Sequence, residues 1–265
     1  MADVAGLLPV AREAVAIARR IVLARAPVSV RSKGDRDPVT DVDLAVEDAV
    51  REFLSRETPH LGVLGEEHGR SGAADGAWWV LDPVDGTANF ARGIPLCGVS
   101  LGLVDGRRAV LAAIDLPYLG ETYSAVEGSG AYAGEQRISA STAAQLSDAM
   151  IAVGDFAVGE GAEVKNQARL RLLEHLGRRA QRIRMLGTAA VDLAWVASGR
   201  LEAAVILANL PWDTLAGVLL VREAGGFVLD GDGTEHTVES SATIAVCPGL
   251  REDLMKCITP YTARV

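Results

Sequence analysis

The sequence predicts an α/β protein in which helices and sheets are stacked in layers. From Cys97 to Ile138 apolar residues alternate with polar ones and glycines mark the turns, which is typical of antiparallel strands. In the second half of the chain short apolar strands alternate with helical segments, as in α/β proteins whose helices cover a sheet. The pattern changes at about 139–147. We therefore expect an N-terminal α+β domain over residues 1–140 and a C-terminal α/β domain over residues 141–265.

Composition restricts the class of protein. The chain has 265 residues, of which 49% are hydrophobic and 23% charged, and its net charge is −9. This profile fits a globular protein, not a disordered or membrane-spanning one, and without a basic run it offers no surface for nucleic acid. The three cysteines are widely spaced among apolar residues, so we expect reduced thiols in a cytoplasmic protein. An acidic protein that binds an anionic substrate needs cations at its site.

The N-terminal segments alternate between helix and polar loop. Apolar residues at helical spacing predict an amphipathic helix from Val4 to Val22. The polar stretch 31–38 lies between breakers and is expected to be a loop. A second helix should begin after Thr40, a plausible N-cap, with Asp43 three residues on. A short strand should follow from Leu61 to Gly65.

The stretch Trp78–Phe90 combines a buried strand with two carboxylates. Trp78–Leu81 is apolar and favours a strand, which Pro83 should end because it lacks an N–H, while Gly86 permits a turn. Asp82 and Asp85 would then lie at the end of a strand, as a hard cation such as Mg²⁺ requires. A strand followed by an ordinary turn is the alternative interpretation.

Acidic residues recur at other element ends. Glu66 follows the strand that ends at Gly65, and Asp213 follows Trp212 where a helix begins. Gly187 and Thr188, at the entrance to another helix, offer N–H groups and a hydroxyl to an anion. Each feature alone is also explained as a turn or a helix cap.

Strands and helices alternate in the second half. In the first half, the turn signal Asp105-Gly106 predicts a hairpin. In the second half, Gly225-Gly226 should end a helix in the left-handed conformation. The expected strands are Ala149–Val153, Ile183–Leu186, Leu201–Leu207, Phe227–Leu229 and Thr243–Val246, and the expected helices are Glu163–Leu176, Val191–Ala197, Thr214–Ala224 and Leu250–Cys257.

Together these motifs resemble the inositol monophosphatase family, the lithium-sensitive, Mg²⁺-dependent phosphomonoesterases. The resemblance runs from Lys33 to about Val246 in the family's order and spacing. Its motifs are Asp37–Asp43, Gly65-Glu66-Glu67, Asp82–Phe90, Gly187–Ala190, and Trp212-Asp213 with Glu223–Gly226. It implies a sandwich with the layer order αβαβα, and a homodimer.

The resemblance also implies a role for particular residues. The Mg²⁺ ligands, for two or three ions, would be Glu66, Asp82, the carbonyl of Val84, Asp85 and Asp213. The catalytic residues would be Asp43, Glu66 and Thr87, with Thr87 and Asp43 activating water. Substrate contacts would come from Lys33, Gly86, Thr87, Gly187, Thr188, Ala189 and Asp213.

The implied reaction is hydrolysis of a small phosphorylated polyol or sugar by direct attack of a metal-activated water. Seven positions before Asp213, where relatives carry an acidic residue for substrate hydroxyls, this chain has Ile206. Inositol-1-phosphate is the expected substrate, and histidinol-phosphate, fructose-1,6-bisphosphate and 3′-phosphoadenosine 5′-phosphate stay open. A different class of function is also open, that of a regulatory binding protein of the transcription machinery.

Overall fold

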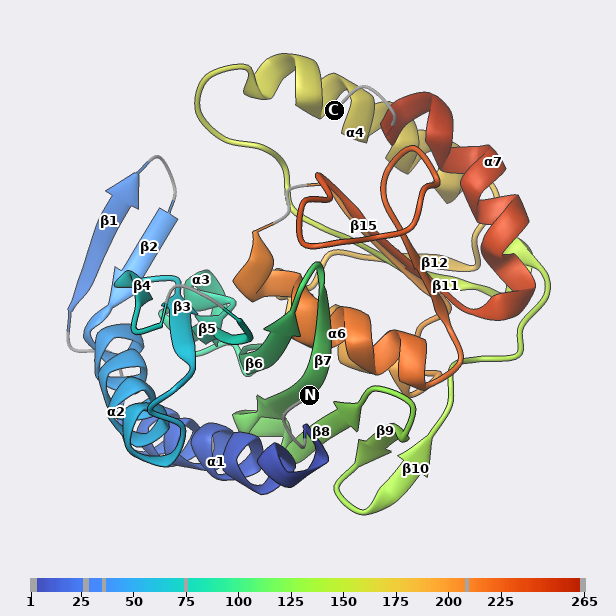
Figure 1. The fold of residues 1–265 in the computed structure, drawn as a ribbon. Helices are drawn as coiled ribbons and strands as arrows, with labels where there is room; N and C mark the ends of the chain where they lie inside the picture. The colour runs from blue at the N-terminus through green and yellow to red at the C-terminus, as the bar shows by residue number, and fades with distance from the viewer. Residues whose placement is uncertain (1–3, 26–28, 35–36, 74–75, 208–209, 263–265) are drawn as a thin grey trace.

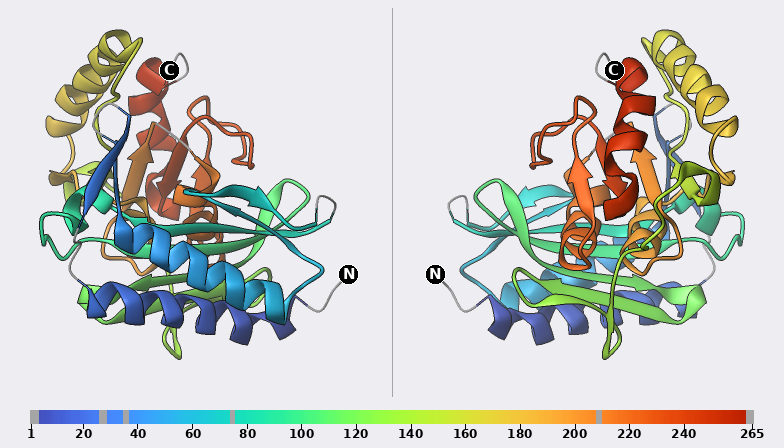
Figure 2. Two further views of the ribbon diagram at one scale, coloured as in Figure 1. Left: turned by 90° about the vertical axis from the view of Figure 1, so that its left-hand side faces the viewer. Right: turned by 90° about the vertical axis from the view of Figure 1, so that its right-hand side faces the viewer.

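The computed structural model describes residues 4–25, 29–34, 37–73, 76–207 and 210–262. Helices and sheets alternate in five layers (Figures 1 and 2). Helices α1 (Leu8–Ala24) and α2 (Asp41–Glu57) cover the outer face of the larger sheet. Helices α5 (Ala189–Ala197) and α6 (Pro211–Glu223) lie between the two sheets, and α4 (Ala162–Gly177) and α7 (Arg251–Thr262) cover the smaller one.

The larger sheet has eight strands in the order β10-β9-β8-β7-β6-β5-β3-β4. All pairs of adjacent strands in this sheet are antiparallel except β3 and β5. These two run parallel and therefore bring their carboxyl ends to one edge of the sheet. The strands are β3 (Gly62–Gly65), β4 (Gly69–Ser71), β5 (Trp78–Asp85), β6 (Gly98–Asp105), β7 (Arg108–Leu116), β8 (Glu121–Val126), β9 (Gly130–Ala133) and β10 (Gln136–Ile138).

The smaller sheet has five strands in the order β12-β11-β13-β15-β14. Strand β11 is parallel to both neighbours, whereas β15 is antiparallel to both of its own. The strands are β11 (Met150–Val153), β12 (Arg182–Arg184), β13 (Ala203–Ile206), β14 (Phe227–Leu229) and β15 (Thr243–Val246).

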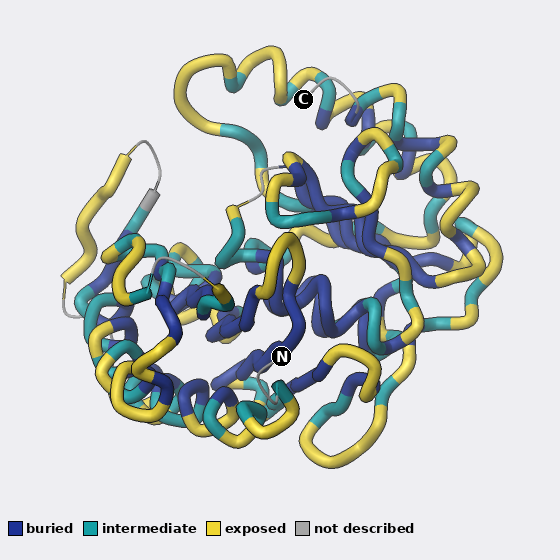
Figure 3. Tube along the Cα trace, viewed as in Figure 1, coloured by how far each residue is buried: buried dark blue, intermediate teal, exposed yellow. Residues whose placement is uncertain are grey.

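The apolar core follows these layers (Figure 3). One cluster packs α1 and α2 on the larger sheet, one fills the space between the sheets, and one packs α4 and α7 on the smaller sheet. The central helices approach closely, because a Cβ added to Gly217 of α6 would lie 2.4 Å from Cδ1 of Leu193 of α5. Helices α5 and α6 therefore join the two sheets; the domain division at residue 140 stays a prediction.

Several local expectations hold. Thr40 caps α2 and forms a capping box with Asp43. Gly225, with φ +86°, follows the end of α6 in the left-handed region. The three cysteines are buried and unpaired by disulfides. No helix in the described part of the chain is long and apolar enough to cross a bilayer.

Two local expectations were wrong. The stretch expected as a loop forms an antiparallel hairpin of β1 (Val30–Gly34) and β2 (Asp37–Thr40), with residues 35–36 outside the described part. The backbone hydrogen bonds of β1 and β2 are made to each other, so the hairpin forms although most of its side chains are polar. Strand β5 also continues past Pro83 to Asp85. Pro83 lies where the register with β6 shifts, so its missing N–H leaves no ladder bond unmade.

Candidate active site

A pocket of about 190 Å³ opens where the carboxyl ends of β3 and β5 meet the amino ends of α5 and α6. Residues from both halves of the chain line it. They are Glu66, Asp82, Val84, Asp85, Gly86, Thr87, Gly154, Asp155, Gly187, Thr188, Ala189, Asp192, Ile206 and Asp213.

The end of β5 is folded by its own polar groups. Asp82 Oδ1 accepts the N–H of Val84 at 3.0 Å, which shapes the irregular end of the strand. Gly86 has φ +88°, and a Cβ there would lie 3.0 Å from the carbonyl oxygen of Leu96 and 3.1 Å from Cβ of Thr188. Only glycine fits both this backbone and this space. The short helix α3 (Thr87–Phe90) follows directly.

Asp85 and Asn89 tie β5 to the second half of the chain. Asp85 Oδ2 accepts the hydroxyl of Thr188 at 2.5 Å and the N–H of Ala190 at 2.5 Å, both at the start of α5. Asn89 donates to the carbonyl oxygens of Leu96 at 2.9 Å and Leu186 at 2.8 Å. The pocket is therefore assembled by specific bonds between segments about 100 positions apart in the sequence.

The pocket carboxylates are held in an unfavourable electrostatic environment. Burial, and then the negative charges of Glu66, Asp85 and Asp213, raise the pKa of Asp82 well above its usual range. Burial, and then the charges of Asp85 and Glu66, do the same to the pKa of Asp213. Burial raises the pKa of Asp85 to about 6, although the hydrogen bonds from Thr188 and Ala190 oppose it. A bound cation would relieve this repulsion.

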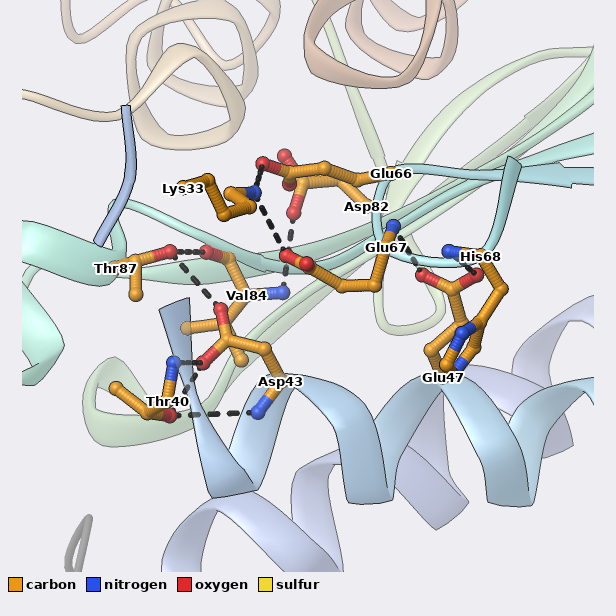
Figure 4. A network of polar contacts seen from close by, with 10 residues as sticks. All are labelled: Lys33, Thr40, Asp43, Glu47, Glu66, Glu67, His68, Asp82, Val84 and Thr87. Atoms are coloured by element: carbon orange, nitrogen blue, oxygen red, sulfur yellow. Dashed lines mark hydrogen bonds and ion pairs between the residues drawn. The ribbon is translucent and has the colours of Figure 1, made fainter. Parts of the chain in front are cut away.

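Asp43 and Thr87 form a hydrogen-bonded pair beside the pocket (Figure 4). The Thr87 hydroxyl lies 3.0 Å from Asp43 Oδ1 and 2.9 Å from the carbonyl oxygen of Val84, so it donates to one of them at a time. Asp43 is buried and is also held by the N–H and hydroxyl of Thr40. Burial raises the pKa of Asp43, against the effect of these hydrogen bonds.

Lys33 reaches the site from the β1–β2 hairpin. Its Nζ lies 2.6 Å from Glu66 Oε1 and 2.9 Å from Glu67 Oε1 (Figure 4). Burial acts to lower the pKa of Lys33, but the hydrogen bonds to the two glutamates outweigh it, and the pKa is raised. The side chain of Glu67 is only 4% exposed, so this contact holds Lys33 as an ammonium ion in the site.

The donor set fits a hard cation. Glu66, Asp82, Asp85 and Asp213 offer only oxygen ligands, as Mg²⁺ prefers, and burial together with neighbouring negative charges raises the pKa values of Asp82 and Asp213. In the described residues no three His, Cys, Asp or Glu side chains are placed to hold a metal ion as they stand. Glu66, one of the four, is paired with Lys33 as the structure stands.

The structure brings the predicted site residues together. All predicted ligands and the residues Gly86, Thr87, Gly187, Thr188 and Ala189 line the pocket, and Asp43 and Lys33 contact lining residues. The sequence reasoning did not identify Asp192. It lies on α5 one turn after Thr188, is 2% exposed, and its Oδ1 has no hydrogen-bond partner in the structure. The signal available in the sequence was a lone aspartate in an otherwise apolar helical segment.

Asp155 lies at the same end of the pocket as Ile206. A Cβ added to Gly154 would lie 3.6 Å from Cα of Ile206, and one added to Gly187 would lie 3.6 Å from Asp155 Oδ2. The side chain of Ile206 therefore borders the pocket among the ends of β11, β13 and α5. Burial, then the charges of Asp85 and Asp155, raise the pKa of Asp192 well above its usual range.

The chain is similar to known proteins over most of its length. The model of the "Inositol monophosphatase family" matches residues 3–262. The chain is 38% identical over 234 residues to "Inositol-1-monophosphatase ImpA" of Mycolicibacterium smegmatis, covering 88% of this chain and 84% of that protein. It is 38% identical over 203 residues to "Nus factor SuhB" of Xylella fastidiosa, covering 77% and 72%.

Solved structures share the fold of this chain. The crystal structure of the extragenic suppressor protein suhB from Bartonella henselae superposes with a TM-score of 0.90 at 33% identity, covering 96% of this chain and 98% of that one. The predicted fold class, a layered α/β sandwich, is confirmed.

Proposed function

We propose that this chain, which belongs to the inositol monophosphatase family, is a Mg²⁺-dependent phosphatase of inositol-1-phosphate or a similarly small phosphorylated polyol. The family consists of phosphatases that hydrolyse phosphate monoesters and are generally metal-dependent, so the predicted family and enzyme class are confirmed. The identity of the metal, two or three Mg²⁺ ions per site, the substrate and the roles of the site residues are our proposal.

One observation carries the proposal. The carboxylates of Glu66, Asp82, Asp85 and Asp213 line a single pocket together with Thr87, whose hydroxyl is bonded to the buried Asp43. Hydrolysis of a phosphate monoester depends on positioning and on neutralising charge. When bound, Mg²⁺ would neutralise the carboxylates, bind phosphate oxygens and make water more acidic.

The Thr87–Asp43 pair supplies a route for a proton. A water that attacks phosphorus donates a hydrogen bond to Thr87 Oγ1, while Thr87 donates to Asp43 Oδ1, 3.0 Å away. As the P–O bond to water forms and the P–O bond to the alcohol breaks, a proton of the water passes to Thr87 and the proton of Thr87 passes to Asp43. The departing alcohol oxygen takes a proton from a solvent water, and Asp43 then returns its proton to solvent. Because burial raises the pKa of Asp43, it is a better base than an exposed aspartate.

The remaining contacts position the phosphate and the alcohol. Gly86 and Thr87 present backbone where β5 turns into α3, and Gly187, Thr188 and Ala189 present the N-terminal end of α5, which favours an anion. Asp213, in the first turn of α6, borders the same pocket. Lys33 adds a positive charge from the β1–β2 hairpin.

The test is phosphate release from a panel of esters. We expect release that requires Mg²⁺, is inhibited by Li⁺ and has its highest kcat/KM with inositol-1-phosphate. The panel includes histidinol-phosphate, fructose-1,6-bisphosphate and 3′-phosphoadenosine 5′-phosphate. If inositol-1-phosphate ranks last, the proposed substrate is wrong while the reaction stands. If no ester releases phosphate with any divalent cation, the proposal fails as a whole.

A second candidate function rests on the likeness to a protein named as a Nus factor. It would make the chain a regulatory partner of the transcription machinery, with or without turnover. Binding to purified RNA polymerase that persists in a variant without phosphatase activity would support it.

A homodimer, expected from the family resemblance, is tested by sedimentation.

A further inference from the structure

Glu47 lies on α2 one turn after Asp43 and is completely buried. Its side chain is 0% exposed, and it forms an ion pair with Arg51, four residues on, at 2.7 Å. A buried carboxylate is costly unless hydrogen bonds compensate it. Its hydrogen-bond partners therefore indicate what it does.

Two of those partners are backbone N–H groups of the turn that carries Glu66. Glu47 Oε2 accepts the N–H of Glu67 at 2.8 Å, and Oε1 accepts the N–H of His68 at 3.0 Å (Figure 4). This turn connects β3 to β4, and Glu66, its first residue, lines the pocket. Two charge-assisted bonds to consecutive amides restrict both the position and the orientation of the turn.

Arg51 holds the opposite side of the same turn. Its Nε donates to Glu47 Oε1 at 2.8 Å, Nη1 donates to the hydroxyl of Ser71 at 2.6 Å, and Nη2 donates to the carbonyl oxygen of Gly69. Packing around Glu47 is tight, because a Cβ added to Gly65 would lie 2.2 Å from Glu47 Oε1. The β3–β4 turn is therefore bound to α2 by side-chain hydrogen bonds.

The same helix also carries Asp43, which binds Thr87. Helix α2 thus holds the Thr87–Asp43 pair through one turn and the backbone beside Glu66 through the next. A helix is rigid over one turn, so it keeps these two parts of the pocket at a constant separation.

We propose that Glu47 is a positioning residue for the metal and water site. By binding the amides of Glu67 and His68, it fixes the turn that carries Glu66 relative to Asp43, one turn earlier on the same helix. The Glu66 carboxylate would thereby be held where it can bind a divalent cation. The proposal rests on the proposed function for its catalytic consequence, but its metal-binding consequence is measured without substrate.

The test compares Glu47→Gln with Glu52→Gln, a matched change at an exposed position of the same helix. Glutamine has one acceptor oxygen where Glu47 uses two, so one amide of the turn loses its bond. Mg²⁺ binding to each metal-free protein is measured by calorimetry, and melting temperature and circular dichroism report the fold. We expect Glu47→Gln to weaken Mg²⁺ binding about 10-fold, as for other outer partners of metal ligands, while Glu52→Gln binds as the unmodified protein does.

Activity adds a second readout. We expect Glu47→Gln to raise the Mg²⁺ concentration for half-maximal activity by a similar factor and to lower kcat with little change in KM, because the substrate contacts stay. A role in stability alone would lower the melting temperature and leave Mg²⁺ binding unchanged; that result, in folded Glu47→Gln, overturns the proposal.

Gly65→Ala provides an independent probe if Glu47→Gln does not fold. The added methyl group would displace the Glu47 carboxylate, and with it the Arg51 guanidinium, and leaves every charge in place. It should weaken Mg²⁺ binding in the same direction, and unchanged Mg²⁺ binding in folded Gly65→Ala would also contradict the proposal. If the unmodified protein binds Mg²⁺ but hydrolyses no ester, the proposed function fails and the positioning role of Glu47 is still decided by calorimetry.

Discussion

The two walls of the pocket are built differently. The wall from the larger sheet comprises Glu66, Asp82, Asp85 and Thr87, and Thr87 and Glu66 are held through α2. The wall from the second half comprises Asp155, Asp192, Ile206 and Asp213, and there Asp155 is exposed and Asp192 Oδ1 has no partner. In the proposed function the first wall carries out the reaction, and the second wall contacts the alcohol part of the substrate. We therefore expect changes on the first wall, and at the proposed ligand Asp213, to alter turnover, and changes at Asp155, Asp192 and Ile206 to alter substrate preference.

Asp85→Asn should have the largest effect. Asparagine retains an oxygen to accept from Thr188 and Ala190, so we expect a folded protein. Loss of the charge removes a proposed ligand, and kcat should fall about 10³-fold or more, since metal stabilisation is worth several kcal/mol. Single-turnover phosphate release measures it, with the exposed Asp105→Asn as control. Activity within a few-fold of the control would show that Asp85 is not a ligand.

Thr87→Ala tests the proton route on the same wall. It removes the hydroxyl that bonds Asp43, and we expect kcat to fall about 10²-fold, the lower end for lost acid–base catalysis. Thr87→Ser keeps the hydroxyl and should stay within a few-fold of the unmodified enzyme. Equal losses in both variants would mean that the methyl group, not the proton, matters.

His236 tests whether a group in the second half of the chain makes the free energy of unfolding depend on pH. It is buried between β14 and β15 with Nε2 2.8 Å from the Thr243 hydroxyl. Burial, then the charge of Arg222, lowers its pKa from 6.5 to about 4. The unfolded chain therefore binds a proton that the folded one does not, and stability present above pH 6.5 is lost as the pH falls towards 4.

Relative to His236→Gln, the unmodified protein should lose about 2 kcal/mol of unfolding free energy between pH 7 and pH 5, measured in urea. The raised pKa values of the pocket carboxylates act in the opposite direction in both proteins and cancel in the comparison. Parallel pH profiles for the two proteins would contradict the prediction.

Ile206→Glu should have the smallest effect. We expect it to change the preference for one substrate over another, and not the rate of hydrolysis. It places a carboxylate where the family resemblance implies a contact with substrate hydroxyls, and we expect kcat/KM for inositol-1-phosphate relative to a simple alkyl phosphate to rise about 10-fold, or about 1.4 kcal/mol. Ile206→Val is the matched control. An unchanged ratio in Ile206→Glu would mean that Asp155 or Asp192 already recognises the hydroxyl groups.

Local patterns predicted much of the fold. Strands β14 and β15 have the expected bounds, and Thr40 caps α2 as its sequence indicates, because these depend on neighbouring residues. The β1–β2 hairpin was missed because its residues are polar and all of β1 is exposed, so no hydrophobic period marks it. The continuation of β5 past Pro83 depends on its pairing with β6, which local sequence does not contain.

The sequence by itself determined the family, the fold class and the candidate ligands, since spaced carboxylates, turn glycines and capping residues are local chemistry. Tertiary structure decided how these groups meet. Only folding brings Asp85 to Thr188, Lys33 to Glu66, and Glu47 to the amides beside Glu66. Burial then raises the pKa values of Asp82 and Asp213. Spacing along the chain does not reveal such contacts, because distance in space and loss of water depend on the packing of all five layers.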